Sequence, residues 1–394
     1  MEAKFKEYAK LLVEVGVNIQ KGQTLVIGSP VDCARFARLC ARAAYAAGCR
    51  EVVMRWSDDE LTREKYLHAE DSVFDSLPAW QAEFDNGYAR QGAAFLHISA
   101  RDPENLVGVD PDRIARSQRS SGEALREYRE LTMSNTVPWC IGSIPIPSWA
   151  RKVFPGCPDG EAVEKLWEAI FQTVRVDGSG AAVDRWREHL AGLKGHMDRL
   201  NGLNLESLHY TNSLGTDLTI RLLEGHIWAA GSSATKSGLP FIANMPTEEV
   251  FTAPLRNGVD GDKIRFQVKE GKIVEASAQT GEDALKAAIT LDEGASYFGE
   301  VALVPYDSPI SRQKLLYYNT LFDENASCHL AFGEAYPECL QGGAEMSKEE
   351  RKARGLNDSI THVDFMVGTA DLSITGKTRD GREVPVFVDG NFAW

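Results

Sequence analysis

The sequence predicts two domains: an α/β domain at residues 1–190, and an α+β domain with a largely antiparallel sheet at residues 191–394. In the first part, apolar strand-like runs alternate with helical patterns, which is typical of a parallel sheet built from strand–helix–strand units. After about residue 200, short alternating strands follow one another around tight turns, which is typical of antiparallel hairpins. A length of 394 residues also fits two or three domains of about 150 residues each.

The first half alternates strands and helices. Apolar runs predict four strands, at residues 24–30, 50–56, 93–99 and 137–145. Residues at helical spacing predict helices at 2–15, about 32–47 and 181–200. Gly16 and Gly48 follow the first two helices and are expected to end them. Because a strand, a helix and a strand fit within about thirty residues, we expect a parallel sheet.

The second half shows a different pattern. Alternating residues at 205–212 and 216–223 surround a short turn, and those at 264–279 surround Lys269–Lys272, so each stretch predicts a hairpin. Residues 381–394 predict a further strand and turn, and the charged stretch 345–355 predicts an exposed helix.

Composition and charge exclude several classes of protein. With 43% hydrophobic and 25% charged residues, the chain is typical of a globular protein rather than a disordered or fibrous one. The net charge of −14, without a Lys/Arg run, argues against nonspecific binding to nucleic acid or anionic membranes. Seven cysteines without CxxC spacing, and a start without the apolar segment of a signal peptide, predict a cytoplasmic protein with reduced thiols.

Residues 318–336 form the densest polar stretch inside apolar sequence. From Ser327 onward the pattern fits a helix, on which His329 and Tyr336 would share one face because seven residues make about two turns. Glu324 would lie one turn before His329, at the start of this helix. Considered alone, the stretch favours a capped helix with a histidine at the core edge and a partly buried tyrosine.

Residues 360–368 have strand character, so His362 and Asp364 are expected to point to one face. A His-x-Asp pair on an apolar strand is a compact pair of metal ligands. An ion pair at a sheet surface is an equally good interpretation.

Two other segments carry carboxylates beside apolar residues. Glu248 and Glu249 are adjacent, so on a strand only one of them can face a given site. A solvated turn before a helix is the alternative for this pair. Glu300 directly precedes an apolar strand-like run, where a carboxylate is usually just exposed.

Together these segments supply at least three carboxylates, two histidines and one tyrosine, which is the ligand set of a two-metal hydrolase. Two divalent ions would carry four positive charges. Glu249, Glu300 and Asp364, with one hydroxide, would balance them. Such a balance is physically reasonable, because isolated buried carboxylates would otherwise cost several kcal/mol each.

Four motifs, NMPTEEVFTAP, GEVALVP, TLFDENASCHLAFGEAY and HVDFMVG, closely resemble the thermophilic-type metallo-aminopeptidases, the family of aminopeptidases T, S and PepS. GVNIQKGQTLVI, AYAAGCREVVMRWSD and LTMSNTVPWCIGSIPIPSWARKVFP resemble the N-terminal domain of that family, so the resemblance spans nearly the whole chain. It implies that the second domain is the metal-binding catalytic domain. It also implies an aminopeptidase that hydrolyses N-terminal residues from peptides through water activated by a dinuclear metal centre.

The resemblance implies a role for each candidate site residue, with Glu300 bridging two metals. The implied metal ligands are Glu249, Glu300, His329, His362 and Asp364. Tyr336 matches the tyrosine considered catalytic in the family. Glu324 is placed with Tyr336 as a catalytic residue that shuttles protons, and an extra ligand or a supporting position remains an alternative for it. No other cofactor site is expected.

The resemblance also bears on metals and partners. Mixed nitrogen and oxygen ligation suits zinc, cobalt or manganese; the resemblance favours two zinc or cobalt ions per chain, with manganese or magnesium as alternatives. It implies a homodimer that encloses the active sites, with access gated by domain movement. We expect peptides with a free N-terminus as substrates, and neither nucleic acid nor a membrane as a partner.

One departure from the family is visible after VFTAP. The family carries a longer segment there with a Gly-Gly turn, whereas LRNGVDGDKIRFQ closes the gap at once. Either the protein truly lacks this segment, which would alter the mouth of the site, or a loop was left out of the numbering. Because the flanks keep the family pattern, we expect the second, with a chain break near Gly261–Asp262. A Cα–Cα distance near 3.8 Å at this point would contradict a break.

Two other functions remain open from the residues. A dinuclear centre could hydrolyse another small amide or ester. Alternatively, the first half could bind a nucleotide or small ligand while the second half is structural. The run TLVIGSPVD contains neither GxGxxG nor GxxxxGK[ST], which counts against a phosphate-binding loop.

Overall fold

The computed structural model describes residues 1–262, 266–278 and 282–394. Two compact units are assembled from interleaved parts of the chain: unit 1 comprises Met1–His189, Ser232–Pro246 and Leu316–Asn319, and unit 2 comprises Leu190–Gly231, Thr247–Leu315 and Thr320–Trp394. The chain first passes from unit 1 to unit 2 near the predicted boundary, but unit 1 also takes two later segments. The division of roles between residues 1–190 and 191–394 stays a prediction.

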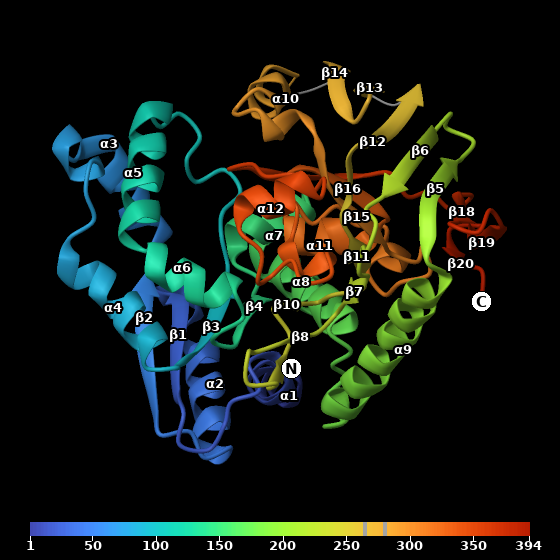
Figure 1. The fold of residues 1–394 in the computed structure, drawn as a ribbon. Coiled ribbons are helices and arrows are strands. Elements are labelled where there is room, and N and C mark those ends of the chain that lie inside the picture. Colours follow the sequence, from blue (N-terminus) through green and yellow to red (C-terminus); the bar gives the residue numbers. More distant parts are fainter. Residues whose placement is uncertain (263–265, 279–281) are drawn as a thin grey trace. The chain divides into compact units, whose positions relative to one another are not determined.

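Unit 1 contains a five-stranded sheet in the order β10–β4–β3–β1–β2, which Figure 1 shows side by side. Its strands are β1 (Thr24–Pro30), β2 (Glu51–Ser57), β3 (Ala94–Ser99), β4 (Trp139–Ser143) and β10 (Asn244–Met245). All neighbouring pairs are parallel. The helix α2 (Ala34–Ala46) lies between β1 and β2 in the chain, so the predicted strand–helix–strand unit is confirmed. β10 escapes prediction because two residues carry no periodicity.

Along the chain, helices precede, separate and follow the strands of unit 1. The chain begins with α1 (Glu2–Leu11), which continues as a π-helical turn to the predicted end at Gly16. A Cβ on Gly16 would lie 2.7 Å from Cys140 Sγ in β4, so only glycine fits there. The later helices are α3 (Asp59–His68), α4 (Ala79–Arg90), α5 (Pro111–Ala124), α6 (Arg126–Met133), α7 (Pro147–Val153) and α8 (Asp159–Thr173). A separate two-stranded sheet joins β8 (Ser233–Ala234) and β9 (Pro240–Phe241).

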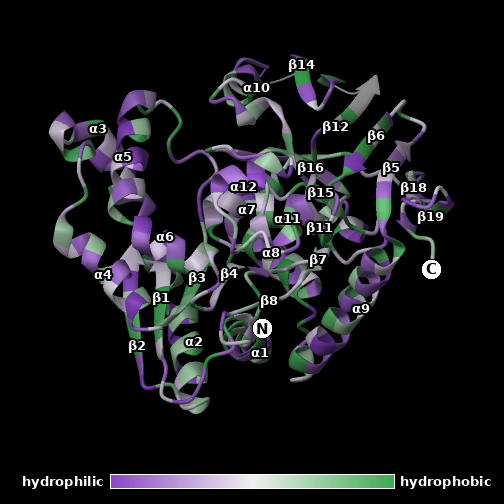
Figure 2. Cartoon of the chain, in the orientation of Figure 1, coloured by the Kyte–Doolittle hydropathy of each residue, from purple (hydrophilic) through white to green (hydrophobic). Residues whose placement is uncertain are grey.

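The long helix α9 (Ala182–Leu203) ends where the first strand of unit 2 begins. Hydrophobic and hydrophilic residues alternate along it (Figure 2), which is the pattern of an amphipathic helix. Leu193 and Leu200 of α9 join the main core of unit 2. The predicted helix at 181–200 is therefore confirmed.

The larger sheet of unit 2 has eight strands in the order β14–β13–β12–β6–β5–β18–β19–β20. These are β5 (Leu205–Thr211), β6 (Asp217–Leu222), β12 (Pro254–Asp262), β13 (Phe266–Lys269), β14 (Lys272–Ala276), β18 (Ser373–Thr378), β19 (Glu383–Val388) and β20 (Asn391–Phe392). Every neighbouring pair is antiparallel. The hairpin predicted at 205–223 and the largely antiparallel character of the second half are confirmed. The hairpin predicted at 264–279 is confirmed over 266–276, whereas residues 264, 265 and 279 lie outside the described ranges.

A second antiparallel sheet of unit 2 has the order β17–β16–β15–β11–β7. Its strands are β7 (Ala229–Ala230), β11 (Val250–Thr252), β15 (Phe298–Leu303), β16 (His329–Gly333) and β17 (His362–Met366). One hydrophobic core joins residues of this sheet, such as Val301 and Leu330, to Leu208 and Ile220 of the larger sheet. The two sheets of unit 2 therefore share one core.

Three short helices complete unit 2: α10 (Glu282–Ile289), α11 (Thr320–Asp323) and α12 (Lys348–Ala353). α12 confirms the exposed helix predicted at 345–355, and none of its residues is buried. Ser347 and Glu350 form a capping box at its start, which satisfies backbone donors that the first turn leaves open. Within the described ranges, no helix combines the length and apolar character that crossing a membrane requires.

Two expectations from the sequence are wrong. The strand β12 runs through Gly261 and Asp262, which pair in unbroken register with Leu218 and Asp217, so the chain is not broken there. The stretch from Ser327 onward does not continue as a helix, because His329–Gly333 form the buried strand β16 between β15 and β17. Sheet pairing on both sides outweighs the weak helical pattern of this run.

Candidate metal centre

Three neighbouring strands place the candidate residues in one row across the sheet. Glu300 of β15 pairs with Ala331 of β16, and Ala331 pairs with Asp364 of β17. Directly paired residues of an antiparallel sheet point to the same face. Glu300, Ala331 and Asp364 therefore share a face, and the small side chain of Ala331 lies between the two carboxylates.

The two histidines lie on the same face of the sheet, and each is two residues away from this row along its own strand. His329 is two residues before Ala331, and His362 is two residues before Asp364, so each keeps the orientation of its neighbour. The opposite face is apolar, and its residues join the main core of unit 2: Val301, Leu330, Phe332, Val363 and Phe365. Period-two alternation thus buries one face and turns the ligand-type side chains toward the other.

Glu249 reaches the site from the segment that precedes β11. Glu248 is only 3% exposed and Glu249 is largely buried, so this segment is no solvated turn, and a strand rather than a helix follows it. The backbone N–H of Glu248 donates to Asn325 Oδ1 at 2.7 Å. The two glutamates that directly precede the apolar strand β11 are thus held in a buried position.

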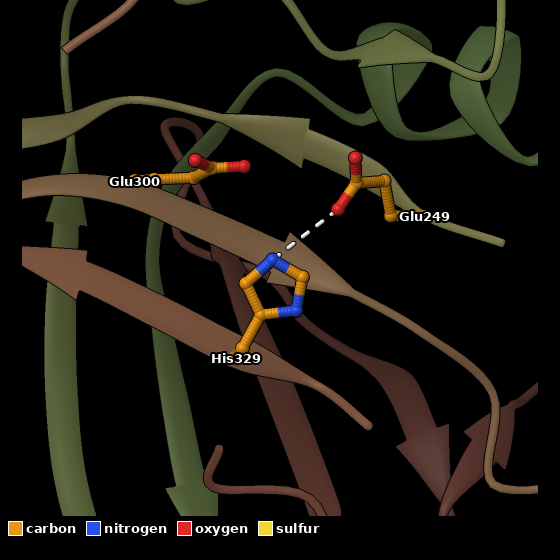
Figure 3. A group of neighbouring side chains, drawn as sticks. All are labelled: Glu249, Glu300 and His329. Carbon is orange, nitrogen blue, oxygen red and sulfur yellow. Dashed lines mark ion pairs between the residues drawn. The ribbon is translucent and has the colours of Figure 1, made fainter. Parts of the chain in front are cut away.

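The carboxylates and imidazoles form two groups that share Glu300. Glu249, Glu300 and His329 offer ligand atoms within 4.8 Å of one another, and so do Glu300, His362 and Asp364. We call these triad A and triad B. In triad A, His329 Nε2 lies 3.2 Å from Glu249 Oε2, and Figure 3 shows Glu300 beside this ion pair. In triad B, His362 Nε2 lies 3.0 Å from Glu300 Oε2 and 3.2 Å from Asp364 Oδ1.

Backbone carbonyls determine which imidazole nitrogen faces the site. His329 Nδ1 lies 3.0 Å from the carbonyl oxygen of Ser327, and His362 Nδ1 lies 2.8 Å from that of Glu334. A carbonyl oxygen can only accept, so each Nδ1 carries a hydrogen and donates it. Each Nε2 is therefore turned toward the carboxylates, which is the arrangement of a metal-binding histidine.

Burial shapes the pKa values of two glutamates. The pKa of Glu300 is raised, mainly by burial; the hydrogen bond from His362 opposes the shift and the charge of Glu249 adds to it. The pKa of Glu324 is raised to about 9 by burial and by the charges of Glu249 and Asp364. Without a cation, this cluster therefore holds carboxyl groups that resist ionisation.

The same negative charges favour the ionised form of the imidazoles, whereas they disfavour the ionised form of the glutamates. Burial by itself lowers the pKa of His329, but the hydrogen bond and charge of Glu249 outweigh it and raise the pKa to about 10. Burial also opposes ionisation of His362, but Asp364 and Glu300 raise its pKa to about 11. Burial by itself raises the pKa of Asp364, but the hydrogen bond and charge of His362, together with the charge of His329, outweigh it and lower the pKa.

Tyr336 lies beyond the end of β16, just before the 3-10 turn Pro337–Cys339. Its ring centroid is 5.1 Å from that of His362 and 5.8 Å from that of Phe251. Burial, with the charges of Glu300 and Asp364, raises the pKa of its hydroxyl well above the usual value. Tyr336 thus reaches the site from the end of a strand rather than from the predicted helical face.

Glu324 begins the 3-10 turn Glu324–Ala326, which directly follows α11. The charges of Glu249, Asp364 and Glu300 all act on its carboxyl, so it belongs to the same cluster. The structure therefore brings together all seven residues singled out from the sequence, while their individual roles stay predictions.

The donor set fits divalent cations. Three acidic side chains and two imidazole Nε2 atoms converge, and both imidazoles are already oriented by backbone acceptors. Buried carboxylates that lie close together repel one another, and a bound cation relieves this repulsion. Nitrogen and carboxylate ligands together suit zinc, cobalt and manganese better than calcium.

Sequence reasoning missed two asparagines beside the triads. Asn325 is 0% exposed and Asn357 is 2% exposed, and both bind backbone groups of the segments that carry the candidate ligands. Asn325 lies inside the recognised motif DENASCHLA. Asn357 lies in the polar run Asn357–Ser359, whose sequence gives no sign of burial.

Comparisons with known proteins agree over the whole chain. A model of the thermophilic metalloprotease family M29 matches residues 1–392. Aminopeptidase AmpS of Bacillus subtilis is 45% identical, with 99% of this chain and 98% of that protein covered. Aminopeptidase T of Thermus thermophilus is 38% identical, with 98% of each covered.

Solved structures agree with these sequence matches. Wild-type AmpT from Thermus thermophilus superposes with a TM-score of 0.92 at 37% identity, covering 100% of both chains. A 2,5-dihydroxypyridine dioxygenase from Pseudomonas putida KT2440 gives a TM-score of 0.52 at 11% identity, with 99% of this chain and 96% of that chain covered. The second likeness concerns the fold alone.

Proposed function

The chain belongs to the M29 family of thermophilic metalloproteases and is a metal-dependent aminopeptidase, and on this basis we propose that its two triads bind two divalent cations. Glu249 and His329 would hold one cation, His362 and Asp364 the other, and Glu300 would bridge them. The sharing of Glu300 between the triads carries this proposal. The substrates would be peptides with a free N-terminus, and each turnover would release the N-terminal residue.

When bound, the two cations supply Lewis acidity and lower the pKa of water toward about 7. The protein supplies the rest of the chemistry. Tyr336, whose raised pKa keeps its hydroxyl protonated, would donate a hydrogen bond to the oxygen of the scissile carbonyl as negative charge develops there. Glu324 would accept a proton from the attacking water and return it to the leaving amine.

The choice of metal follows from the donor set. Two imidazoles and three carboxylates suit zinc or cobalt, and manganese or magnesium are weaker alternatives. The His329 and His362 rings are fixed by their Nδ1 hydrogen bonds, which favours tight binding of a cation at Nε2.

We also propose a cytoplasmic homodimer. All seven cysteines are unpaired in the structure, which supports a reducing compartment. The homodimer rests on the resemblance of the motifs to the family. Sedimentation equilibrium of the purified protein tests the dimer.

Metal content paired with activity tests the proposed function. The purified protein is expected to hold about two zinc or cobalt ions per chain and to hydrolyse leucine p-nitroanilide. Chelation should abolish this activity, and added zinc or cobalt should restore it. An N-acetylated leucine anilide serves as the matched control, because a blocked amine should not be accepted. Activity that survives complete removal of metal, or cleavage of the blocked substrate at an equal rate, would contradict the proposal.

A further inference from the structure

Asn325 joins two segments of unit 2 that are 77 residues apart in the chain. Its Oδ1 accepts the backbone N–H of Glu248 at 2.7 Å, and its Nδ2 donates to the carbonyl oxygen of Leu321 at 3.0 Å. Only this orientation of the amide satisfies both partners, because an N–H cannot accept and a carbonyl cannot donate. The residue after Glu248 is Glu249 of triad A, and the residue before Asn325 is Glu324. One buried amide thus fixes both carboxylate-bearing segments.

Asn357 likewise makes hydrogen bonds that join separate backbone segments of unit 2. Its Nδ2 donates to the carbonyl oxygens of Gly333 at 2.6 Å and Gly294 at 2.9 Å, and its Oδ1 accepts from Arg256 Nε at 3.0 Å. Its own carbonyl oxygen accepts the N–H of Ala335 at 3.2 Å. These contacts clamp the turn that follows β16.

This turn positions His362 of triad B. Gly333 is the register partner of His362, and the carbonyl oxygen of the next residue, Glu334, accepts from His362 Nδ1. The backbone is in close contact here, since a Cβ on Gly333 would lie 2.0 Å from the carbonyl oxygen of Thr361. Glu334 Oε2 also accepts the N–H of Ser359 at 2.6 Å. A shift of this turn would therefore rotate or release the imidazole.

We propose that Asn325 and Asn357 are positioning residues for two separate cation sites, Asn325 for triad A and Asn357 for triad B. The inference rests on the proposed dinuclear centre. Neither amide belongs to a triad, and each acts through backbone groups. Among the residues that the structure describes, the two asparagine side chains share no hydrogen-bond partner. Loss of one should therefore weaken one cation site and leave the other nearly intact.

Titration of the metal-free chain with zinc tests this separation. The variants are Asn325→Ala and Asn357→Ala. The matched control is Asn201→Ala, because Asn201 also clamps a backbone segment, with Trp228 N–H and carbonyl at 2.9 and 3.0 Å. Calorimetry should show two zinc sites in the wild type and in the control. Asn325→Ala and Asn357→Ala should each lose about 10- to 100-fold in zinc affinity, and at one site only.

Double variants identify the weakened site. On a His329→Ala background, Asn325→Ala should add little, whereas on a His362→Ala background it should weaken the remaining site by about the same 10- to 100-fold factor. The pattern should reverse for Asn357→Ala. Such non-additivity within one triad and additivity between triads is the signature of two independent positioning contacts.

Several outcomes would overturn the inference: wild-type binding at both sites, or equal weakening of both sites in either variant. Circular dichroism of the metal-free proteins checks folding, and Asn325→Ser and Asn357→Ser replace any alanine variant that does not fold. If the serine variants also fail to fold, the asparagines serve the fold itself and the inference is wrong. A wild type that binds fewer than two zinc ions would instead contradict the proposed function.

Discussion

Glu300 and Ala331 are register partners on β15 and β16, so the carboxylate shared by both triads stands beside a single methyl group. Asp364 pairs with Ala331 from the other side. Ala331 is fully buried. It therefore lies between two carboxylates on one face of the sheet, and its side chain is the smallest that carries a Cβ. We call this position the floor of the site.

A larger residue at this position should weaken cation binding. Ala331→Val adds two methyl groups between Glu300 and Asp364, and such overpacking costs about 1–3 kcal/mol. If this strain falls on the metal-bound form, zinc affinity should drop about 5- to 150-fold. Ala331→Ser is the matched control, because a hydroxymethyl group is much smaller than an isopropyl group. Equal zinc binding by the wild type and the valine variant, measured by calorimetry, would contradict this account of the floor.

Loss of the Tyr336 hydroxyl should affect turnover rather than metal binding. Tyr336→Phe keeps the ring that packs against Phe251 and His362 but removes the hydrogen-bond donor. The expected fall in kcat is about 10²- to 10³-fold, with metal content unchanged. Steady-state hydrolysis of leucine p-nitroanilide measures the effect. A variant with normal kcat would show that the hydroxyl takes no part in the reaction.

The shared position of Glu300 predicts unequal effects of two carboxylate substitutions. Glu300→Gln should weaken both cation sites, because both triads include it, whereas Asp364→Asn should weaken only the site of triad B. Elemental analysis after dialysis gives the metal count per chain. Glu206→Gln, at an exposed carboxylate that pairs with Lys377, is the control. Loss of a single ion from Glu300→Gln would argue against a bridging role.

Metal uptake should depend strongly on pH. In the metal-free chain the neighbouring carboxylates raise the pKa of His329 to about 10 and that of His362 to about 11, so both imidazoles are protonated near neutral pH. A cation must displace these protons, and binding therefore weakens as the pH falls below these pKa values. Because each cation displaces one imidazole proton, the affinity at each site should change about tenfold per pH unit, and the product of the two binding constants about a hundredfold.

Calorimetry in two buffers with different ionisation enthalpies counts the released protons. Two protons per fully loaded chain are expected from the histidines, and Glu324, whose pKa is raised to about 9, can contribute another. A zinc affinity that stays constant across neutral and mildly alkaline pH would show that the imidazoles are neutral before the cation arrives.

Local periodicity explains why much of this fold was predictable. The strands β1, β2 and β17 follow from apolar runs or alternation, and the shared face of His362 and Asp364 follows from a period of two. The helical expectation after Ser327 failed for a physical reason. The run His329–Gly333 is buried on both sides by pairing with β15 and β17, and sequence alone does not display those partners.

The assembly of the site depends on contacts between distant segments. Glu249, Glu300 and His329 lie on three separate segments, and no spacing in the sequence requires them to meet; the family resemblance, rather than periodicity, placed them together. The clamps of Asn325 and Asn357 depend on backbone groups, whose positions a residue pattern does not encode. The sequence likewise gives no sign of the position of Ala331 between two carboxylates, because an alanine in an apolar run is ordinary.

The two-residue strand β10 limits how the chain can be divided. It extends the parallel sheet of unit 1 beyond β4, and the Ile141 N–H of β4 donates to the Ala243 carbonyl at 2.8 Å. A fragment that ends at residue 190 would lack this neighbour and leave β4 as an open edge, ready to pair with another molecule. Such a fragment, produced alone, should aggregate even though helices α1 to α8 and four of the five strands of the sheet are present.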